Sequence, residues 1–566
     1  MKRLMLSLTV FLLIACMMVS CTAPLYEDPN AQGSAFVGSG TDADNNDLVS
    51  ILVPGGANYT GTDLLTQPKG KEQVVNGGNL ATNTKFNANA GETFPDADKI
   101  IEAGRADTPI YGIYCWIEDF ERYYDSIQDI GFTNARIGNA SGMSERQFRL
   151  LAESDIDYFF TVGVSANSYI KPEAQSKSNL TLDDFDLDAW YQKNVDFAIN
   201  LLRKYGPNGT FFQENPDVNY NPCVALEIYN EPNYGYMVSD KKTSLDVRAQ
   251  LYARVLCVLY DAIKAEFPEV QVIGGGLGGA SNDDAAFLRK VFNAVPESAQ
   301  KMDVLSTHHS YTIESVSAFA YKVNSTTSLG GLLKNLRSTM SGADCDVPVW
   351  YTEGGWMLNH NHGGELSESN GGCDQLTQAA MLVQQCVFGI RCGLERITFM
   401  YIIDTDGCNY GFIYRNGYVD GDDGSKWRLS AYAMETMIEI LPDPVLTDVI
   451  YEGLDDKGNI SGVFAYEIEP APGAEPVVVV CTTAEPTEVS IPWEEEYAVV
   501  TDLFGTSKII QAKKGKITLE AGTCMLYVRK VSEVPDLDKV INYTEMKNHL
   551  QLDSTYAWVP SDEDLV

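Results

Sequence analysis

The feature that most constrains the fold is an alternation of apolar, β-prone segments with amphipathic segments between residues 105 and 441. Each β-prone segment is followed by a stretch in which apolar residues recur at helical spacing. The β-prone segments lie at 111–114, 134–137, 158–164, 224–229, 270–274, 304–306, 347–351 and 396–402. Eight strand–helix units of this kind predict a (β/α)8 barrel, an α/β fold, with enlarged loops.

Local signals mark several helix ends. Gly131 follows the helical segment after the first strand, and glycine commonly ends a helix. Ser144 is followed three residues later by Gln147, which is the pattern of a capping box. A long amphipathic stretch runs from Ser244 to Phe267 and stops at a proline. We therefore expect helices to end at Ile130 and to begin after Ser144.

An open, doubly wound sheet is the alternative fold. Such sheets usually carry a Gly-x-Gly-x-x-Gly turn after the first strand, and this chain has none there. The glycine-rich run 274–279 resembles a phosphate loop, but it lacks the Lys-Ser/Thr that such a loop requires. We interpret the run as a tight turn of the barrel.

The pattern changes on either side of the predicted barrel, 105–441. Residues 442–531 contain short strands with period-two alternation and predict a small antiparallel β-sandwich. Residues 532–566 are polar, and we expect them to form a surface tail. Residues 22–104 are rich in Gly, Asn, Thr and Asp, and we expect a tether and N-terminal segment there. A chain of 566 residues is long enough for these separate units.

The first 21 residues resemble a bacterial lipoprotein signal peptide. A Lys-Arg pair precedes an apolar stretch that is too short to span a membrane. Cys16 and Cys21 each follow a run similar to a lipobox, in which the cysteine is acylated. The choice between them stays open, with Cys21 giving the more usual signal length. We expect a lipid-anchored protein of the bacterial cell envelope, periplasmic or surface-exposed.

Charge and cysteine spacing exclude several classes of protein. The net charge of −37 argues against nucleic acid as a partner, because phosphate binding needs a basic surface. The cysteines form no Cys-x-x-Cys pair, which argues against a zinc ribbon. A soluble protein acting on neutral or cationic substrates fits this composition.

Two glutamates end two of the predicted strands. The fourth strand stops at Asn230-Glu231-Pro232, and the seventh stops at Glu353. In a (β/α)8 barrel the acting groups lie at the carboxyl ends of the strands, and strands four and seven face each other there. Two facing carboxyl groups are what a retaining glycosidase uses.

These motifs resemble glycoside hydrolase clan A, the retaining (β/α)8 glycosidases. The run 229–233, Tyr-Asn-Glu-Pro-Asn, and the preceding run 204–210 are most similar to family 39, with families 5 and 30 as close competitors. The resemblance covers about 105–530, including the trailing β-sandwich. It implies a hydrolase that needs no cofactor and no metal.

The resemblance assigns the two glutamates. Glu231 would be the general acid/base, and Glu353 would be the nucleophile that forms a glycosyl-enzyme. Glu365 and Glu368 follow closely in the sequence and are rivals for the second role.

The resemblance also implies supporting residues. Arg136 would keep the nucleophile ionised, and Asn230 would bind the sugar 2-hydroxyl group. His309 and Tyr311 match the clan's His-x-Tyr after strand six, where they would orient the acid/base and the nucleophile. His308 and His309 could alternatively serve in packing and capping.

Aromatic side chains near the strand ends offer surfaces for sugar rings. Trp116 and Trp356 could stack on a pyranose face, or could belong to the core. Clan members often carry Trp at the end of strand eight, whereas this chain has Tyr401. That departure leaves the shape of the sugar subsite open.

Two segments contain weak metal-binding patterns. His360-Asn361-His362 lies in a glycine-rich stretch, and 420–424 resembles part of a calcium loop without its final glutamate. We interpret both as solvated loops.

The sequence therefore favours a retaining glycoside hydrolase that acts on a polysaccharide or oligosaccharide. The alternative is a non-catalytic glycan-binding surface lipoprotein on the same scaffold. We expect the loops 165–189, 232–243 and 354–375, which follow strands three, four and seven, to determine the choice of sugar.

Overall fold

The structure of the protein is a computed structural model. It describes residues 97–103, 110–138, 140–278, 283–311, 329–358, 375–404, 410–413, 427–454, 460–482, 487–531, 550–552 and 558–560. The predicted signal peptide, including Cys16 and Cys21, lies outside the described residues, as do the weak metal-binding patterns at 360–362 and 420–424. Among the described helices, none is long and apolar enough to cross a membrane.

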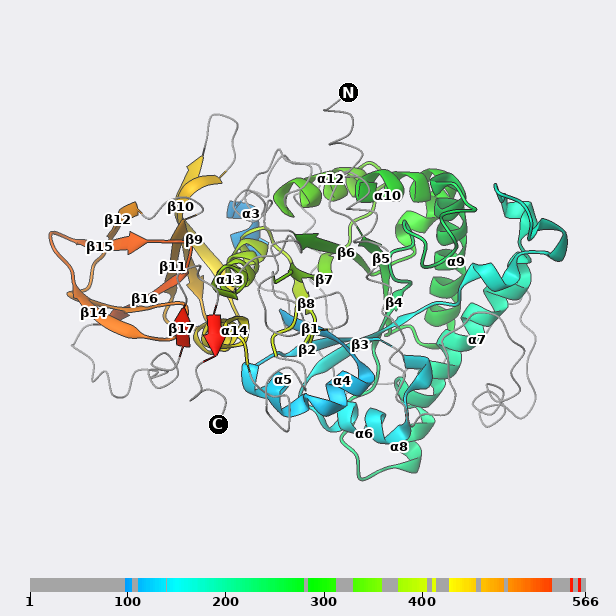
Figure 1. Cartoon of the computed structure of the whole chain (residues 1–566), viewed down its shortest axis with the longest axis horizontal. Coiled ribbons are helices and arrows are strands. Elements are labelled where there is room, and N and C mark those ends of the chain that lie inside the picture. The colour runs from blue at the N-terminus through cyan, green and yellow to red at the C-terminus, as the bar shows by residue number, and fades with distance from the viewer. Residues whose placement is uncertain are drawn as a thin grey trace.

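The first domain is a closed barrel of eight parallel strands (Figure 1). The strands are β1 (Tyr111–Trp116), β2 (Asn134–Gly138), β3 (Asp157–Val162), β4 (Ala225–Ile228), β5 (Gln271–Gly278), β6 (Val304–Tyr311), β7 (Val349–Trp356) and β8 (Arg396–Met400). They pair in chain order, and β1 pairs with β8 to close the sheet. The predicted (β/α)8 barrel is confirmed.

Helices surround the barrel (Figure 1). They are α3 (Ala97–Ala103), α4 (Ile117–Arg122), α5 (Tyr124–Ile130), α6 (Glu145–Glu153), α7 (Leu187–Tyr205), α8 (Thr210–Glu214), α9 (Leu245–Glu266), α10 (Asp283–Ala294), α12 (Leu329–Ser341), α13 (Gln375–Arg391) and α14 (Leu429–Ile440). The two predicted helix signals are confirmed. Gly131 ends α5 in the left-handed conformation, with φ of 94°. Ser144 and Gln147 form the reciprocal bonds of a capping box at α6.

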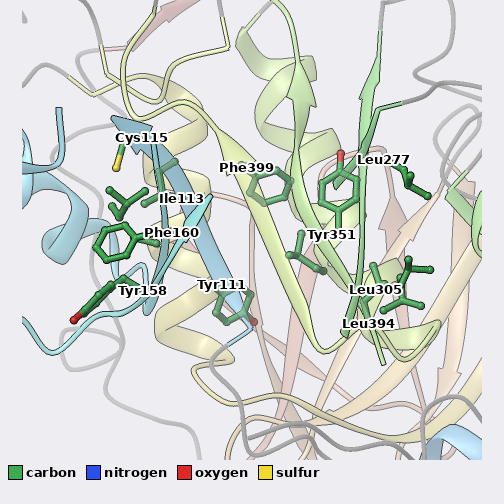
Figure 2. Packing of buried hydrophobic residues seen from close by; sticks show 14 of the residues in the cluster. Tyr111, Ile113, Cys115, Tyr158, Phe160, Leu277, Leu305, Tyr351, Leu394 and Phe399 are labelled. Carbon is green, nitrogen blue, oxygen red and sulfur yellow. The ribbon is translucent and has the colours of Figure 1, made fainter. Parts of the chain in front are cut away.

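Side chains of the barrel strands alternate between two apolar clusters. Tyr158 and Phe160 belong to the large cluster between the sheet and the helices, part of which is shown in Figure 2. Phe159, which lies between them in the sequence, packs against Trp350 with ring centroids 5.9 Å apart. Because β3 and β7 are not neighbours, this contact crosses the barrel interior. The interior is therefore filled by side chains, and its polar groups form a separate layer beyond this apolar one.

The described part of the glycine run, 274–278, does not form the tight turn that we expected. Strand β5 continues through it to Gly278, and its pairing with β6 shifts register between Gly274 and Leu277. Gly275 and Gly276 have φ values of +99° and +52°. Glycine adopts these angles without the penalty of a side chain, so the strand bulges and continues instead of turning.

The second domain is a two-layered antiparallel unit. Its strands are β9 (Val445–Leu454), β10 (Ile460–Glu469), β11 (Val477–Thr482), β12 (Thr487–Pro492), β13 (Tyr497–Thr501), β14 (Ser507–Gln511), β15 (Lys516–Ala521) and β16 (Leu526–Val531). One sheet has the order β14-β13-β16-β11-β10-β9, and β12 pairs with β15. Ile491 and Ile517 of the small sheet share an apolar cluster with Val480 and Val528 of the large one. The predicted β-sandwich is confirmed.

In the final segment, the structure describes residues 550–552 and 558–560. Strands β17 (Leu550–Leu552) and β18 (Trp558–Pro560) pair antiparallel within the stretch expected to be a polar tail.

Two barrel helices, α13 and α14, lie between the barrel and the large sheet (Figure 1). The Gln384 side chain on α13 donates to the Thr523 carbonyl at 2.6 Å. Arg391 at the end of α13 donates to Glu452 of β9 at 2.7 Å, and its side chain is 4% exposed. The sandwich is therefore bonded to the side of the barrel through buried polar contacts.

Candidate active site

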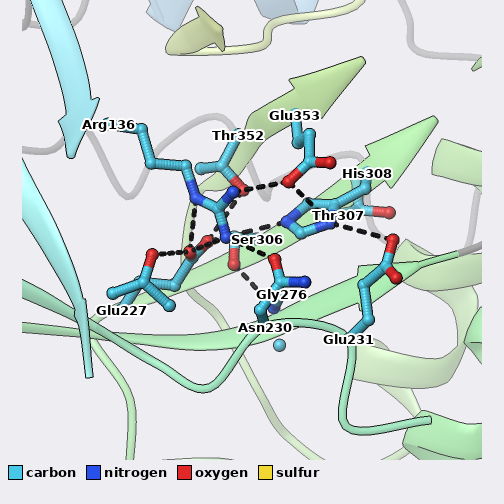
Figure 3. A network of polar contacts seen from close by, with 12 residues as sticks. Arg136, Glu227, Asn230, Glu231, Gly276, Ser306, Thr307, His308, Thr352 and Glu353 are labelled. Carbon is cyan, nitrogen blue, oxygen red and sulfur yellow. Dashed lines mark hydrogen bonds and ion pairs between the residues drawn. The ribbon is translucent and has the colours of Figure 1, made fainter. Parts of the chain in front are cut away.

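A layer of polar side chains lies inside the barrel, toward the carboxyl ends of the strands (Figure 3). Arg136 of β2, Glu227 of β4 and His308 of β6 are almost wholly buried. The Glu353 side chain at β7 is 12% exposed, and the Glu231 side chain after β4 is 19% exposed. The base of this layer is thus dry, while the two predicted catalytic carboxyl groups reach solvent.

Arg136 contacts three of the other groups through separate nitrogens. It donates from Nη1 to Glu353 Oε2 at 2.5 Å, from Nη2 to Asn230 Oδ1 at 2.7 Å and from Nε to Glu227 Oε2 at 2.7 Å. Its guanidinium carbon lies 4.5 Å from the centre of the Tyr114 ring. Burial lowers the pKa of Arg136, but the two carboxylates raise it more, so the guanidinium stays charged.

The backbone around Glu231 has an unusual conformation. Tyr229 and Glu231 have φ values of 67° and 42°, in the left-handed region that side chains disfavour. The Glu231 N–H donates to the Gly276 carbonyl at 2.7 Å. A Cβ atom on Gly278 would lie 2.4 Å from Glu231 Cδ. The glycines of the β5 bulge therefore provide both the bond and the space that place this carboxyl group.

The two predicted catalytic carboxyl groups converge. One oxygen of Glu231, one oxygen of Glu353 and one nitrogen of His308 all lie within 4.8 Å of one another. His308 Nδ1 is 3.4 Å from Glu231 Oε1 and 3.8 Å from Glu353 Oε2. Such proximity is compatible with the carboxyl separation of about 5–5.5 Å typical of retaining glycosidases.

Charge in this layer alters the pKa of His308. Burial alone would lower it, but Glu353, Glu227 and Glu231 raise it to about 9. The ring is therefore an imidazolium at neutral pH.

Opposing effects act on Glu353. Burial is the largest and raises the pKa, His308 and Arg136 lower it, and Glu231 and Glu227 raise it again. The net direction is upward. Glu353 therefore takes up a proton more readily than an isolated carboxyl group would.

Sequence reasoning did not single out Glu227. This residue is 0% exposed, and its carboxylate also accepts hydrogen bonds from Thr161 at 3.0 Å and Thr352 at 2.8 Å. Burial raises its pKa, but Arg136 and His308 lower it more, so that it lies far below its usual range. A charged residue in the middle of an apolar strand was the available signal, because such a residue needs a buried partner.

Strand β6 carries two adjacent histidines, His308 and His309. The resemblance gave His309 the role of orienting Glu231, and in the structure His308 makes that contact. His309 and Tyr311 lie on β6, opposite Gly354 and Trp356 of β7, but their side chains are outside the described residues. Their roles stay predictions.

The predicted sugar-stacking residues have different surroundings. Trp116 is partly exposed and lies 5.8 Å from the Tyr114 ring, which in turn lies 5.1 Å from Tyr401. Trp356 is 1% exposed, which favours the core alternative for it. An aromatic surface therefore borders the guanidinium of Arg136 on the β1 and β8 side.

Glu231, His308 and Glu353 have the spacing of a metal site. However, the Glu353 oxygen nearest His308 is the one that accepts from Arg136. A metal ion would have to lie beside a guanidinium and an imidazolium. This charge environment opposes cation binding, so we do not assign a metal here.

The loops after β3 and β4 are joined at the carboxyl end of the barrel. The Ala166 N–H donates to the Met237 carbonyl at 2.9 Å, and the Leu180 N–H donates to the Lys242 carbonyl at 2.8 Å. Glu231 lies in the first turn of the β4 loop, three residues after β4 ends at Ile228, so this paired structure follows a predicted catalytic group.

Comparisons with known proteins give a structural relationship. No protein-family model and no curated protein sequence matches the chain. A family 39 glycoside hydrolase from the gut symbiont Bacteroides cellulosilyticus WH2 matches with a TM-score of 0.52 and 18% identity, over 75% of this chain and 81% of that one. The chain has the fold of a family 39 glycoside hydrolase. The predicted resemblance is confirmed at the level of fold.

Other glycoside hydrolases are more distant neighbours of this family 39 fold. A family 51 α-L-arabinofuranosidase from Bifidobacterium longum matches with a TM-score of 0.48 and 11% identity, over 74% of this chain and 97% of that one. A monomeric β-xylosidase from Caulobacter crescentus CB15 matches with a TM-score of 0.45 and 12% identity, over 75% of this chain and 98% of that one.

We expect the ionisation of His308 to make stability depend on pH. A raised folded-state pKa stabilises the protein fully below the unfolded value of 6.5, and this contribution is lost as pH rises through about 9. At about 1.4 kcal/mol per pKa unit, the loss is at most about 3 kcal/mol. Thermal unfolding of the wild type and of His308→Asn should diverge between these pH values, with the wild type falling more steeply. Parallel curves would contradict the assignment.

Proposed function

We propose that the protein is a retaining glycoside hydrolase that cleaves O-glycosidic bonds of a polysaccharide or oligosaccharide. The observation that carries the proposal is the convergence of Glu231 and Glu353 within 4.8 Å at the carboxyl end of the barrel. Arg136 bonds one of them, and solvent reaches both. A pair at this spacing supports double displacement rather than inversion, which needs a gap wide enough for water.

The contacts of the two carboxyl groups distinguish their roles. Arg136 donates to Glu353, and this bond favours the ionised form of that carboxyl group. Glu231 instead faces His308, whose Nδ1 lies 3.4 Å from Glu231 Oε1. Glu231 is thus suited to protonate a leaving oxygen, and Glu353 is suited to attack the anomeric carbon.

The first step forms a bond between Glu353 and the anomeric carbon and breaks the glycosidic bond. The leaving oxygen takes the proton of Glu231. In the second step Glu231 removes a proton from water, the water oxygen bonds to the anomeric carbon, and Glu353 leaves as a carboxylate. Asn230 accepts from Arg136 through Oδ1, which leaves its Nδ2 group to donate to a sugar hydroxyl.

Azide rescue tests these roles. We expect Glu353→Ala to lose about a thousandfold or more of its turnover on aryl glycosides, because the bond-forming group is absent. Azide should restore turnover and give a glycosyl azide of inverted configuration. Glu231→Ala should lose about 10²–10⁴-fold of its turnover on substrates with poor leaving groups. With this variant, azide should give a glycosyl azide of retained configuration. Product configuration is measured by NMR.

Glu365→Ala and Glu368→Ala serve as controls, since both residues were rivals for the nucleophile and both lie outside the described residues. Inverted azide product from either variant would overturn the assignment of Glu353. If the folded wild type hydrolyses neither aryl glycosides nor a panel of polysaccharides but binds glycan arrays, the glycan-binding alternative replaces the proposed enzyme.

Gly278→Ala tests how Glu231 is placed. The new methyl group would lie 2.4 Å from Glu231 Cδ, so the flexible carboxyl end must move while the fold persists. We expect kcat to fall by about 10–100-fold with little change in the unfolding temperature, since a misplacement of about 1 Å can cost about 10²-fold. Gly522→Ala is the control, because no atom lies within 4 Å of the position that its Cβ would occupy. Equal kcat values for the two variants would contradict the prediction.

We also propose that the chain is exported and anchored to the bacterial envelope by an acylated cysteine, on the basis of its first 21 residues. Labelling with an alkyne analogue of palmitate should mark the wild type. Cys21→Ser or Cys16→Ser should abolish labelling, and the variant that does so identifies the acylated residue. Labelling that survives in both single variants would contradict a single lipobox cysteine.

A further inference from the structure

We propose that Glu227 is a positioning residue: it is the buried counter-charge that keeps His308 protonated between the two proposed catalytic glutamates. Its effect on turnover rests on the proposed function, whereas its effect on His308 does not.

Glu227 faces both positively charged groups of the site from the buried side of the polar layer. Its Oε2 accepts from Arg136 at 2.7 Å and from Thr161 at 3.0 Å. Its Oε1 accepts from Thr352 at 2.8 Å and lies 3.9 Å from His308 Nε2. The side chain is 0% exposed, so solvent does not screen its charge. Glu227 is therefore placed to act on Arg136 and His308 at once.

The environment of His308 favours the doubly protonated ring. Its Nδ1 faces Glu231 and Glu353, and its Nε2 faces Glu227. Nε2 is buried and makes no hydrogen bond among the described residues, and Glu227 Oε1 faces it at 3.9 Å. Either neutral tautomer would direct a nitrogen lone pair at a carboxylate oxygen. The imidazolium places an N–H on both sides.

A charge count shows what Glu227 balances. The ionisable groups around His308 are Arg136 from β2, Glu227 and Glu231 from β4, and Glu353 from β7. With His308 protonated, Arg136 and His308 carry two positive charges, and Glu227 is the carboxylate that lies against both. Burial raises the pKa values of the nearby phenols Tyr114 and Tyr252, so these stay neutral.

Asp284 of α10 is a further buried carboxyl group near this layer; its carboxylate accepts from Thr307 and lies 3.5 Å from the Asn233 amide. Removing the charge of Glu227 would take away one of the negative charges that raise the pKa of His308. His308 would then release its proton at lower pH.

Histidine NMR tests this directly. The chain has five histidines, so a protein labelled at histidine Cε1 gives few signals, and His308→Asn identifies the one of interest. We expect the wild-type His308 signal to titrate near 9. In Glu227→Gln, which keeps the shape and removes the charge, the midpoint should fall by more than about one pH unit. An unchanged midpoint in Glu227→Gln overturns the proposal.

Glu395→Gln is the matched control. Glu395 is also a buried glutamate, 2% exposed, and accepts from Trp350 Nε1 at 3.2 Å, but it precedes β8 at the opposite end of the barrel. Its substitution should leave the titration midpoint of His308 unchanged. An equal shift of the midpoint in both variants would mean that any buried substitution in the barrel causes it, and would contradict a specific role for Glu227. If Glu227→Gln does not fold, a wild-type midpoint below 7 overturns the proposal by itself.

The pH profile of kcat/KM gives the catalytic readout. We expect the alkaline limb of Glu227→Gln to move to lower pH, because His308, which faces both proposed catalytic glutamates, would lose its proton at lower pH. Glu227→Asp retains the charge and should keep the limb near its wild-type position, even where its rate is reduced. If Glu227→Gln lowers kcat/KM equally at every pH and leaves both limbs of the profile in place, the role of Glu227 is merely structural. A protein without glycosidase activity would contradict the proposed function, while the NMR result would still decide the role of Glu227.

Discussion

The ion pair between Arg136 and Glu227 is the interaction on which the polar layer depends. It crosses the barrel interior from β2 to β4 in the absence of solvent, and Glu353, Asn230 and His308 each lie against one of its two members. Burying two charges costs several kcal/mol per ion in desolvation, and a well-packed apolar pair would often be at least as stable. The pair is thus better explained by the geometry that it imposes on Glu353, Asn230 and His308 than by stability.

Much of this arrangement follows from the sequence. The alternation of strand-like and helix-like segments determines the barrel, because parallel strands require crossover helices and eight such units close. The barrel brings the strand ends together, which is why Glu231 and Glu353 could be paired from positions far apart in the chain. The catalytic pair is thus a consequence of topology, and it needs no local signal beyond a glutamate where each strand stops.

The rest of the site depends on how neighbouring strands pair, which local sequence patterns do not contain. Glycines 274–276 favour a turn by their own preference, yet the pairing of β5 with β6 carries the strand through them as a bulge. A second register shift separates the pairs Thr307–Tyr351 and His308–Glu353, and its extra residue, Thr352, lies on β7. Thr352 and Glu353, neighbours in the sequence, therefore both contact the polar layer. Alternation along a strand can be counted in a sequence, but a bulge reverses its phase, and bulges depend on partner strands. Glu227 was missed because its partners come from four other strands.

The paired loops after β3 and β4 have a consequence for how this protein can change. Backbone bonds from Ala166 to Met237 and from Leu180 to Lys242 make the two loops one structural unit. A length change in either loop would remove bonds from the other and would disturb the segment that begins at Glu231. The two loops are therefore expected to vary together among descendants of this chain. An engineer who wishes to transplant a new specificity onto this scaffold should exchange both loops as one module.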